Sequence, residues 1–239
     1  LGTGNGMSHI VGAGDPMRDL QQIVDLTPGR TRSISLVEWE RERFFFGGCG
    51  YDSMLLNDYN WLKAHTHHFL LKKALQSVAG YFAALFMRTL PKIISKSGAK
   101  LEVRIVSRGR SFYIDPRRGD YSVELEPGTV LFEGPATFVG VGTTPFFGAG
   151  FRVFPFACLM PGMMNLRVAS MHAVSLLAHL KSLWNGSLRN PTGIFDFFAE
   201  DIAVELSEPF PFQHSGDDQG LRDRLTFKVS EQKLDVVDF

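Results

Sequence analysis

The spacing of apolar residues changes twice along the chain. In residues 1–30 it is helical: Asp15 can cap a helix that starts at Pro16, and one face carries four apolar side chains, Met17, Leu20, Ile23 and Val24. From residue 31 the apolar positions alternate, and the stretches "RSISLVEWE" and "FFFGGCGYD" predict a β-hairpin whose second strand ends in glycines. Residues 53–94 return to helical spacing and predict an amphipathic helical insertion.

After Gly98 the pattern is almost wholly of the β type. Short apolar runs are separated by Gly and Pro, namely "KLEVRIVS", "RSFYIDP", "YSVELEPG", "TVLFEG", "ATFVGVGT", "FRVFP" and "MNLRVASM". One helix is expected over roughly residues 173–184, after which strands return in "DIAVELSEP", "FPFQHSG" and "LTFKVSEQ". The predicted fold class is therefore mostly β with helical segments (α+β), built on an antiparallel β-sandwich.

The amino-acid composition excludes some classes of function but does not point to a particular function. The 239 residues carry no net charge, whereas a general nucleic-acid binder needs a basic excess, so no nucleic-acid partner is expected. Phenylalanine occurs 21 times against 5 Tyr and 3 Trp, which suits a β core or an apolar pocket. The apolar stretch at residues 78–87 is too short to cross a bilayer and no signal peptide is recognisable, so we expect a cytoplasmic protein.

The cysteine and histidine spacings predict no metal site. Cys49 and Cys158 lie in apolar, strand-like runs and are expected to be buried free thiols in a reducing compartment. His65 and His68 stand about one helical turn apart, a spacing that can bind zinc. Because no Glu or Cys completes the set, a surface helix is the favoured interpretation.

Three polar or glycine-rich turns are candidates for chemistry. The opening "LGTGNG" precedes a helix start and suits either a capping loop or a phosphate-binding turn. In "GGCGYD" a strand ends at Asp52, which is either a turn residue or a carboxylate directed at a ligand. In "QHSGDDQG" the neighbouring carboxylates of Asp217 and Asp218 suit a solvated turn, a general base or a metal ligand.

The order of these motifs resembles the diacylglycerol kinase family, which includes bacterial lipid kinases and the eukaryotic sphingosine and ceramide kinases. The resemblance runs from Leu1 to about Val237, through "LGTGNGMSH", "FFFGGCGYD", "VLFEGPATFVGVGTTPFFGAGFRVFP" and "FQHSGDDQGLRDRLTFKV". It implies an ATP-dependent lipid kinase that uses Mg²⁺ and has its site between an α/β nucleotide domain and a β-sandwich. We expect residues 1–30 to be the end of the nucleotide domain and residues 31–239 the sandwich, with residues 53–94 inserted.

The resemblance assigns roles to two of the glycine-rich turns. "GTGN" is similar to the family's second nucleotide motif, which implies ATP contacts for Gly2, Thr3, Gly4 and Asn5. Asp52 matches the family's Gly-aromatic-Asp, which implies that Gly50 and Asp52 contact the lipid headgroup. The family's first motif, a Gly-Gly-Asp-Gly-Thr loop, has no counterpart here, so we expect this chain alone to bind ATP poorly.

Two departures from the family affect the expected catalytic groups. The family's Asp-Gly-Glu, whose Asp serves as base, aligns with Ser215, Gly216 and Asp217. A serine cannot accept a proton at neutral pH without a base of its own, so Asp217 is the candidate replacement for base or metal binding. The family's Lys-Leu-Asp-Asp-Gly turn reads "CLMPG", and Met160 and Pro161 cannot hold its magnesium.

Several alternatives stay open at this point. The substituted Ser215 favours a lipid-binding pseudokinase of the same fold, while a NAD kinase-like phosphotransferase suits the architecture but not the apolar insertion. The insertion can line an acyl-chain entrance, rest on a membrane surface as a peripheral contact, or cover an edge of the sandwich. Exposed strand edges would permit a homodimer. The lipid itself can be a diacylglycerol, a sphingoid base, a ceramide or an undecaprenol-like alcohol.

Overall fold

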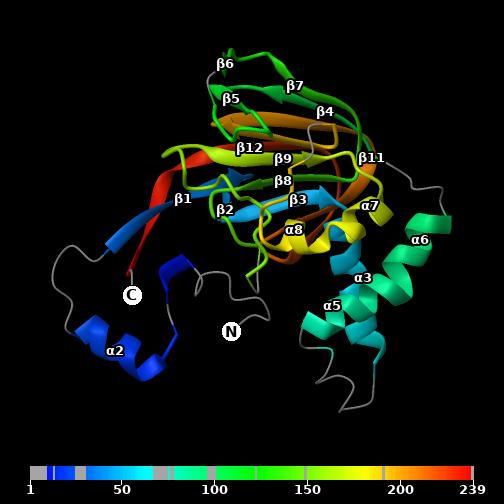
Figure 1. The fold of residues 1–239 in the computed structure, drawn as a ribbon, viewed down its shortest axis with the longest axis horizontal. Helices are drawn as coiled ribbons and strands as arrows, with labels where there is room; N and C mark the ends of the chain where they lie inside the picture. Colours follow the sequence, from blue (N-terminus) through cyan, green and yellow to red (C-terminus); the bar gives the residue numbers. More distant parts are fainter. Residues whose placement is uncertain are drawn as a thin grey trace.

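The sheet dominates the computed structural model, which describes residues 10–12, 14–24, 31–66, 75, 78–95, 101–121, 123–147, 150–189 and 192–237. In this part of the chain twelve strands form one antiparallel sheet (Figure 1), and its inner side chains make up the main apolar core. The strands along its path are β2 (Glu42–Phe44), β1 (Thr31–Trp39), β12 (Asp217–Val237), β11 (Asp201–His214), β3 (Phe46–Gly50), β8 (Phe138–Gly142), β9 (Met164–Ala169), β10 (Ile194–Ala199), β5 (Ser111–Ile114) and β6 (Val123–Leu125). The predicted α+β class is confirmed.

Strand β11 is the point at which the sheet forks. Its first half, Ile202–Leu206, pairs with β4 (Leu101–Ser107), which in turn pairs with β7 (Val130–Ala136). Its second half, Phe212–His214, pairs with β3. The register with β12 shifts between the two halves, where Pro209 offers no N–H to a ladder. The fork lets β4 and β7 fold over the other strands.

The main core lies between the β4–β7 pair and the strands that this pair folds over, and it contains many of the phenylalanines. Along β4 the burial alternates, with Val103 and Ile105 inward and Arg104 exposed between them. The rings of Phe132 on β7 and Phe195 on β10 meet across the layers, with centroids 5.3 Å apart. Four further phenylalanines are buried in the same cluster, Phe44, Phe197, Phe212 and Phe227.

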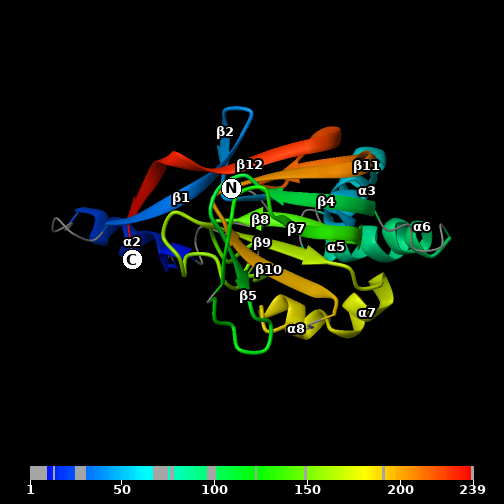
Figure 2. The same ribbon diagram turned by 90° about the horizontal axis from the view of Figure 1, so that it is seen from above.

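The helices gather at the ends of the sheet. They are α2 (Pro16–Val24), α3 (Tyr51–His65), α5 (Val78–Ala84), the π-helix η1 (Leu85–Thr89), α6 (Leu90–Ser95), α7 (Ala173–Ala178) and α8 (Leu180–Trp184). The group α3, α5, η1 and α6 projects from one end of the molecule in both views (Figure 2). Helical structure in the insertion is thus confirmed where it is described. Among the described helices, none is long and apolar enough to span a bilayer.

Helix α2 begins as its sequence predicts. The Asp15 carboxylate accepts a hydrogen bond from the backbone N–H of Met17 at 2.9 Å, which caps the first turn. The apolar face of the helix is exposed in this structure, with Met17, Leu20, Ile23 and Val24 all accessible to solvent.

Three local predictions are wrong. "FRVFP" is no strand: turns follow Phe154, because Pro155 lacks an N–H and Cys158 takes a left-handed φ of 70°. The thiol of Cys158 lies on an exposed residue, whereas Cys49 is buried as predicted and burial raises its pKa. The expected helix over residues 173–184 breaks into two short helices at His179.

Candidate functional site

The junction between β3 and α3 is built on glycines. A Cβ on Gly48 would lie 2.3 Å from the backbone oxygen of Val139, and one on Gly50 would lie 2.4 Å from that of Thr137. Gly50 also has a φ of 131°, which L side chains rarely adopt. The strand therefore packs directly against β8, and the chain turns into α3 with the N–H of Tyr51 donating to the oxygen of Thr137 at 2.9 Å.

Gly50→Ala is expected to lower the free energy of unfolding by about 2–4 kcal/mol, because it adds a backbone clash to the strain of a positive φ. Gly134→Ala is the matched control, since φ there is 135° but no atom lies within 4 Å of the added Cβ. In this variant only the backbone strain should lower the free energy of unfolding, by about 1–2 kcal/mol. Urea unfolding of both variants measures the difference, and equal losses would contradict the packing role of Gly50.

Asp52 follows this junction in the first turn of α3 and is the most perturbed carboxyl group of the site. One of its oxygens, Oδ2, accepts a hydrogen bond from Nε2 of Gln213 at 3.0 Å. The other, Oδ1, is buried and accepts no hydrogen bond of good geometry in the described structure, although the backbone N–H groups of Asp52 and Ser53 lie close enough to lower the pKa of the group. Burial raises the pKa of Asp52 to about 6, against the opposing effect of the Gln213 hydrogen bond. Such a group changes its charge close to neutral pH.

This pKa predicts a pH dependence of stability. Because the pKa of Asp52 rises from 3.8 to about 6 on folding, protonation favours the folded state. The stabilisation is complete below about pH 4 and is lost as the pH rises through 6, by about 3 kcal/mol in total. Unfolding free energies of the wild type and Asp52→Asn between pH 4 and 7.5 measure this loss as the difference between the two curves. Parallel curves would contradict the shifted pKa.

Gln213 links Asp52 to the hairpin that joins β11 and β12. Its side chain is buried, and while Nε2 donates to Asp52, its Oε1 accepts from the N–H of Gly216 at 3.0 Å. The two contacts fix the orientation of the amide, because the backbone N–H can only donate. The carboxyl group of Asp52 is thereby held against the tip of the hairpin.

The hairpin tip itself is a tight two-residue turn. Ser215 and Gly216 have φ values of 51° and 86°, as a type I′ turn requires, and His214 and Asp217 pair across it. The N–H of Ser215 donates to the oxygen of Phe46 at 2.9 Å, which fastens the turn to β3. The side chains of Ser215 and Asp217 are exposed. Asp217 therefore begins strand β12 rather than sitting in a longer polar loop.

His214 anchors the same turn from the other side. Its ring stacks on that of Phe44, with centroids 4.5 Å apart and planes within 4°. Its Nε2 lies 2.7 Å from a carboxylate oxygen of Glu42, and its buried Nδ1 has no partner in the described structure. These contacts join the β1–β2 hairpin to the site.

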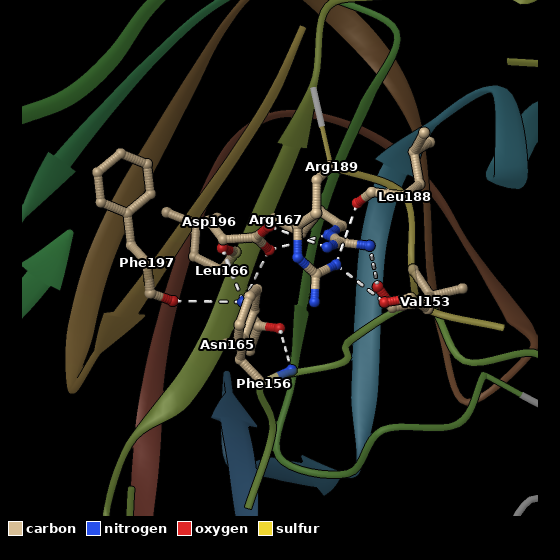
Figure 3. A network of polar contacts seen from close by, with 10 residues as sticks. Val153, Phe156, Asn165, Leu166, Arg167, Leu188, Arg189, Asp196 and Phe197 are labelled. Atoms are coloured by element: carbon tan, nitrogen blue, oxygen red, sulfur yellow. Dashed lines mark hydrogen bonds and ion pairs between the residues drawn. The ribbon is translucent and has the colours of Figure 1, made fainter. Parts of the chain in front are cut away.

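A buried ion pair supports the segment that contains "CLMPG" (Figure 3). Arg167 donates to both oxygens of Asp196, at 2.8 and 2.9 Å, and to the backbone oxygen of Val153 at 2.9 Å. The amide oxygen of Asn165 accepts from the N–H of Phe156 at 3.3 Å. The loop is thus fastened to β9 and β10 by side chains. Met160 and Pro161 lie in this loop and carry no carboxylate that could bind a metal.

Of the predicted site residues, the structure brings together Gly50, Asp52 and the turn at residues 215–217. The nucleotide residues Gly2, Thr3, Gly4 and Asn5 lie outside the described part of the chain. Gln213, which connects Asp52 to the turn, was not recognised from the sequence. The sequence offers one indication of this role. Gln213 stands two residues before Ser215, on the same face of an alternating strand, in a stretch that otherwise buries apolar side chains.

Of the comparisons with known proteins, the one with solved structures identifies the fold. No protein-family model matches the chain, and no curated protein matches it in sequence. A solved structure of a diacylglycerol kinase from Bacillus anthracis strain Sterne is similar over 100% of this chain and 67% of its own length, at a TM-score of 0.62 and 15% identity. Another structure from that strain, assigned provisionally as a diacylglycerol kinase, has a TM-score of 0.61 at 15% identity and the same coverages. The chain thus has the fold of these proteins.

Proposed function

We propose that this chain is the lipid-binding part of an ATP-dependent lipid kinase of the diacylglycerol kinase family. One observation carries the proposal: within a fold shared with a diacylglycerol kinase, a buried carboxyl group with a free oxygen lies where the family resemblance expects the lipid headgroup. The reaction class is transfer of the γ-phosphoryl group of ATP to a lipid hydroxyl. The sequence resemblance and the fold support it independently.

In this proposal Asp52 accepts the hydrogen bond of the lipid hydroxyl. Its Oδ2 is held by Gln213, so Oδ1 is the oxygen left to receive a donor. A pKa of about 6 leaves most of the group ionised at pH 7, which suits an acceptor of the hydrogen bond from the lipid hydroxyl. Gly50 contributes by letting the backbone turn at this point.

Asp217 is proposed for the role of base or metal ligand. It stands one residue after Gly216, at the turn that Gln213 ties to Asp52. Ser215 occupies the position of the family's base, and among the described residues no base forms a hydrogen bond with its hydroxyl group, so the serine is assigned no proton transfer.

ATP and Mg²⁺ belong to the proposal as cosubstrate and counter-ion. Gly2, Thr3, Gly4 and Asn5 would contact the nucleotide, as part of an α/β domain to which residues 1–30 contribute. The described residues hold no group of three or more His, Cys, Asp or Glu side chains that could bind a metal ion. We assign Mg²⁺ to the phosphates of ATP, with Asp217 as the candidate protein ligand.

A pseudokinase that binds lipid without phosphorylating it is the second candidate. The exposed Ser215 in place of a catalytic carboxylate is the observation that favours it. A NAD kinase-like activity is disfavoured, because the apolar side chains exposed on the helical insertion suit a lipid better than a dinucleotide.

The test is a phosphoryl-transfer assay on the full-length protein with radiolabelled ATP and Mg²⁺. Mixed micelles would present diacylglycerol, sphingoid base, ceramide or a long-chain isoprenoid alcohol, each in a separate reaction, and one further reaction would contain NAD in place of lipid. Label in one lipid extract is the expected result and identifies the substrate class. A folded protein that binds these lipids but transfers no label would establish the pseudokinase, and labelled NAD without labelled lipid would contradict both.

A further inference from the structure

Two arginine side chains meet at Gly186, in the turn that follows α8. A Cβ on Gly186 would lie 3.0 Å from Cγ of Arg152, and the backbone oxygen of Gly186 accepts a hydrogen bond from Nη1 of Arg189 at 2.9 Å. The N–H of Arg152 donates to the oxygen of Trp184 at 2.9 Å, which holds this arginine beside the turn. Nη1 of Arg189 also donates to the oxygen of Leu188 at 3.1 Å. We call Arg152 and Arg189 the arginine pair.

The arginine pair has no counter-ion in the described part of the chain, where no carboxylate forms an ion pair with either residue. Asp196 is the carboxylate that acts on Arg189, but both of its oxygens bind Arg167. Arg167 and Arg189 lie next to each other in Figure 3, so three guanidinium groups share one carboxylate. Burial and the charges of Arg167 and Arg152 lower the pKa of Arg189. An anion bound here would relieve this repulsion between like charges.

The free donors of the arginine pair suit an oxyanion with two negative charges. Nε and Nη2 of Arg189 donate to no acceptor among the described residues, and together they form the edge that binds two oxygens of a phosphate. The guanidinium of Arg152 has no hydrogen-bond partner among these residues either. The ring of Phe156 covers one face of the Arg189 guanidinium, 4.6 Å from its central carbon, which fixes the plane of the donors before a ligand binds.

The segment that carries Arg152 also contacts the candidate site. The ring of Phe147 stacks on that of Phe46, with centroids 4.3 Å apart, and the oxygen of Phe46 accepts the N–H of Ser215. The N–H of Phe147 donates to the oxygen of Phe151 at 2.8 Å, one residue before Arg152. The arginine pair is therefore connected to the turn at Ser215 through a short series of contacts.

We propose that the arginine pair is a binding site for a phosphate group. This chemistry is shared by free phosphate, by the phosphates of a nucleotide and by the headgroup of a phosphorylated lipid. The site goes beyond the proposed function, because binding there requires neither phosphoryl transfer nor the carboxyl group of Asp52.

Isothermal titration of the full-length protein with inorganic phosphate at low ionic strength tests the proposal. We expect phosphate binding that is at least tenfold weaker in Arg152→Gln/Arg189→Gln, since hydrogen bonds between charged groups are lost. Arg117→Gln/Arg118→Gln is the matched control. It removes the same charge from two other exposed arginines, which have the carboxylate of Asp115 nearby, and should bind phosphate within twofold of the wild type. Circular dichroism establishes that all variants fold.

The single variant Arg152→Gln provides a second readout in thermal unfolding. Because its guanidinium makes no hydrogen bond in the described structure, Arg152→Gln should unfold at no lower temperature than the wild type in phosphate-free buffer. Low concentrations of phosphate should raise the Tm of the wild type and have less effect on Arg152→Gln. Arg152→Lys should recover part of the response, because lysine restores the charge but not the planar donors.

Titrations with ATP and with a short-chain phosphatidic acid distinguish the sources of the phosphate. The natural source is the ligand whose affinity falls most in Arg152→Gln/Arg189→Gln. Unchanged affinity for all three probes in this variant, equal losses in the two double variants, or no binding of any probe to the wild type would overturn the proposal.

The phosphate site and the kinase assignment can fail separately. A wild type that binds phosphate through the arginine pair but labels no lipid keeps the site and contradicts the kinase. Labelled lipid, together with phosphate binding that does not depend on Arg152 and Arg189, keeps the kinase and contradicts the site.

Discussion

Asp196→Ala is expected to lower the free energy of unfolding by about 3–5 kcal/mol, the range seen when one partner of a buried ion pair is removed. Arg167 and Asp196 are 1% and 3% exposed, and two hydrogen bonds join them. The substitution leaves the guanidinium buried without its counter-charge. It also removes the group that orients Arg167 toward the oxygen of Val153, so the loop after β8 loses an attachment.

Chemical denaturation of the wild type and two further variants measures this effect. Glu205→Ala removes a carboxylate that pairs with Arg104 and Arg224 on the surface, where ion pairs contribute at most about 1 kcal/mol. Arg167→Met/Asp196→Leu replaces both charges by apolar groups and should lose less than Asp196→Ala alone. If Asp196→Ala costs no more than Glu205→Ala, the ion pair does not hold the loop.

The second large effect is expected at the lipid site. Asp52→Asn should lower kcat/KM for lipid phosphorylation by about 10–100-fold, because it removes the charged acceptor that holds the lipid hydroxyl, and a hydrogen bond to a charged group contributes about 1.5–3 kcal/mol. The amide keeps the shape of the carboxyl group and an oxygen for the Nε2 of Gln213, so the site should stay folded. In the wild type the rate should also fall as the pH drops through about 6, where Asp52 becomes protonated.

Gln213→Leu is the companion variant, because it removes the contact to Asp52 without touching the carboxyl group. Loss of this donor should raise the pKa of Asp52 and move the acid limb of the pH–rate profile upward. A profile that does not move, together with a small effect of Asp52→Asn, would show that Asp52 takes no part in the reaction.

The sequence predicted the parts of the fold that depend on local patterns. Alternating residues placed Val103 and Ile105 on a strand with an inward face, and the Asp15–Pro16 pair marked the start of a helix. The glycines of "GGCGYD" marked a real junction, because Gly50 has a backbone geometry that other residues avoid. In each case the residues that determine the local structure lie within one short stretch of the chain.

Contacts between distant stretches could not be predicted in this way. Gln213 meets Asp52 across 161 residues, and Arg167 meets Asp196 across 29, so no local period reveals either pair. The prediction of a strand in "FRVFP" was wrong for the same reason. Its apolar residues serve a loop, held in place by Arg167 and by Asn165, which lie outside that stretch.

The most direct measurement of the central claim is label transfer from radiolabelled ATP to lipid by the full-length protein, with Asp52→Asn and Asp217→Asn assayed beside it. We predict labelled lipid with the wild type and about 10–100-fold less with Asp52→Asn. A loss of label transfer in Asp217→Asn would support Asp217 as base or metal ligand. Full activity of Asp217→Asn would exclude Asp217 from that role. Wild-type protein that binds the lipid and labels none of it, or Asp52→Asn that labels it at the wild-type rate, would contradict the account.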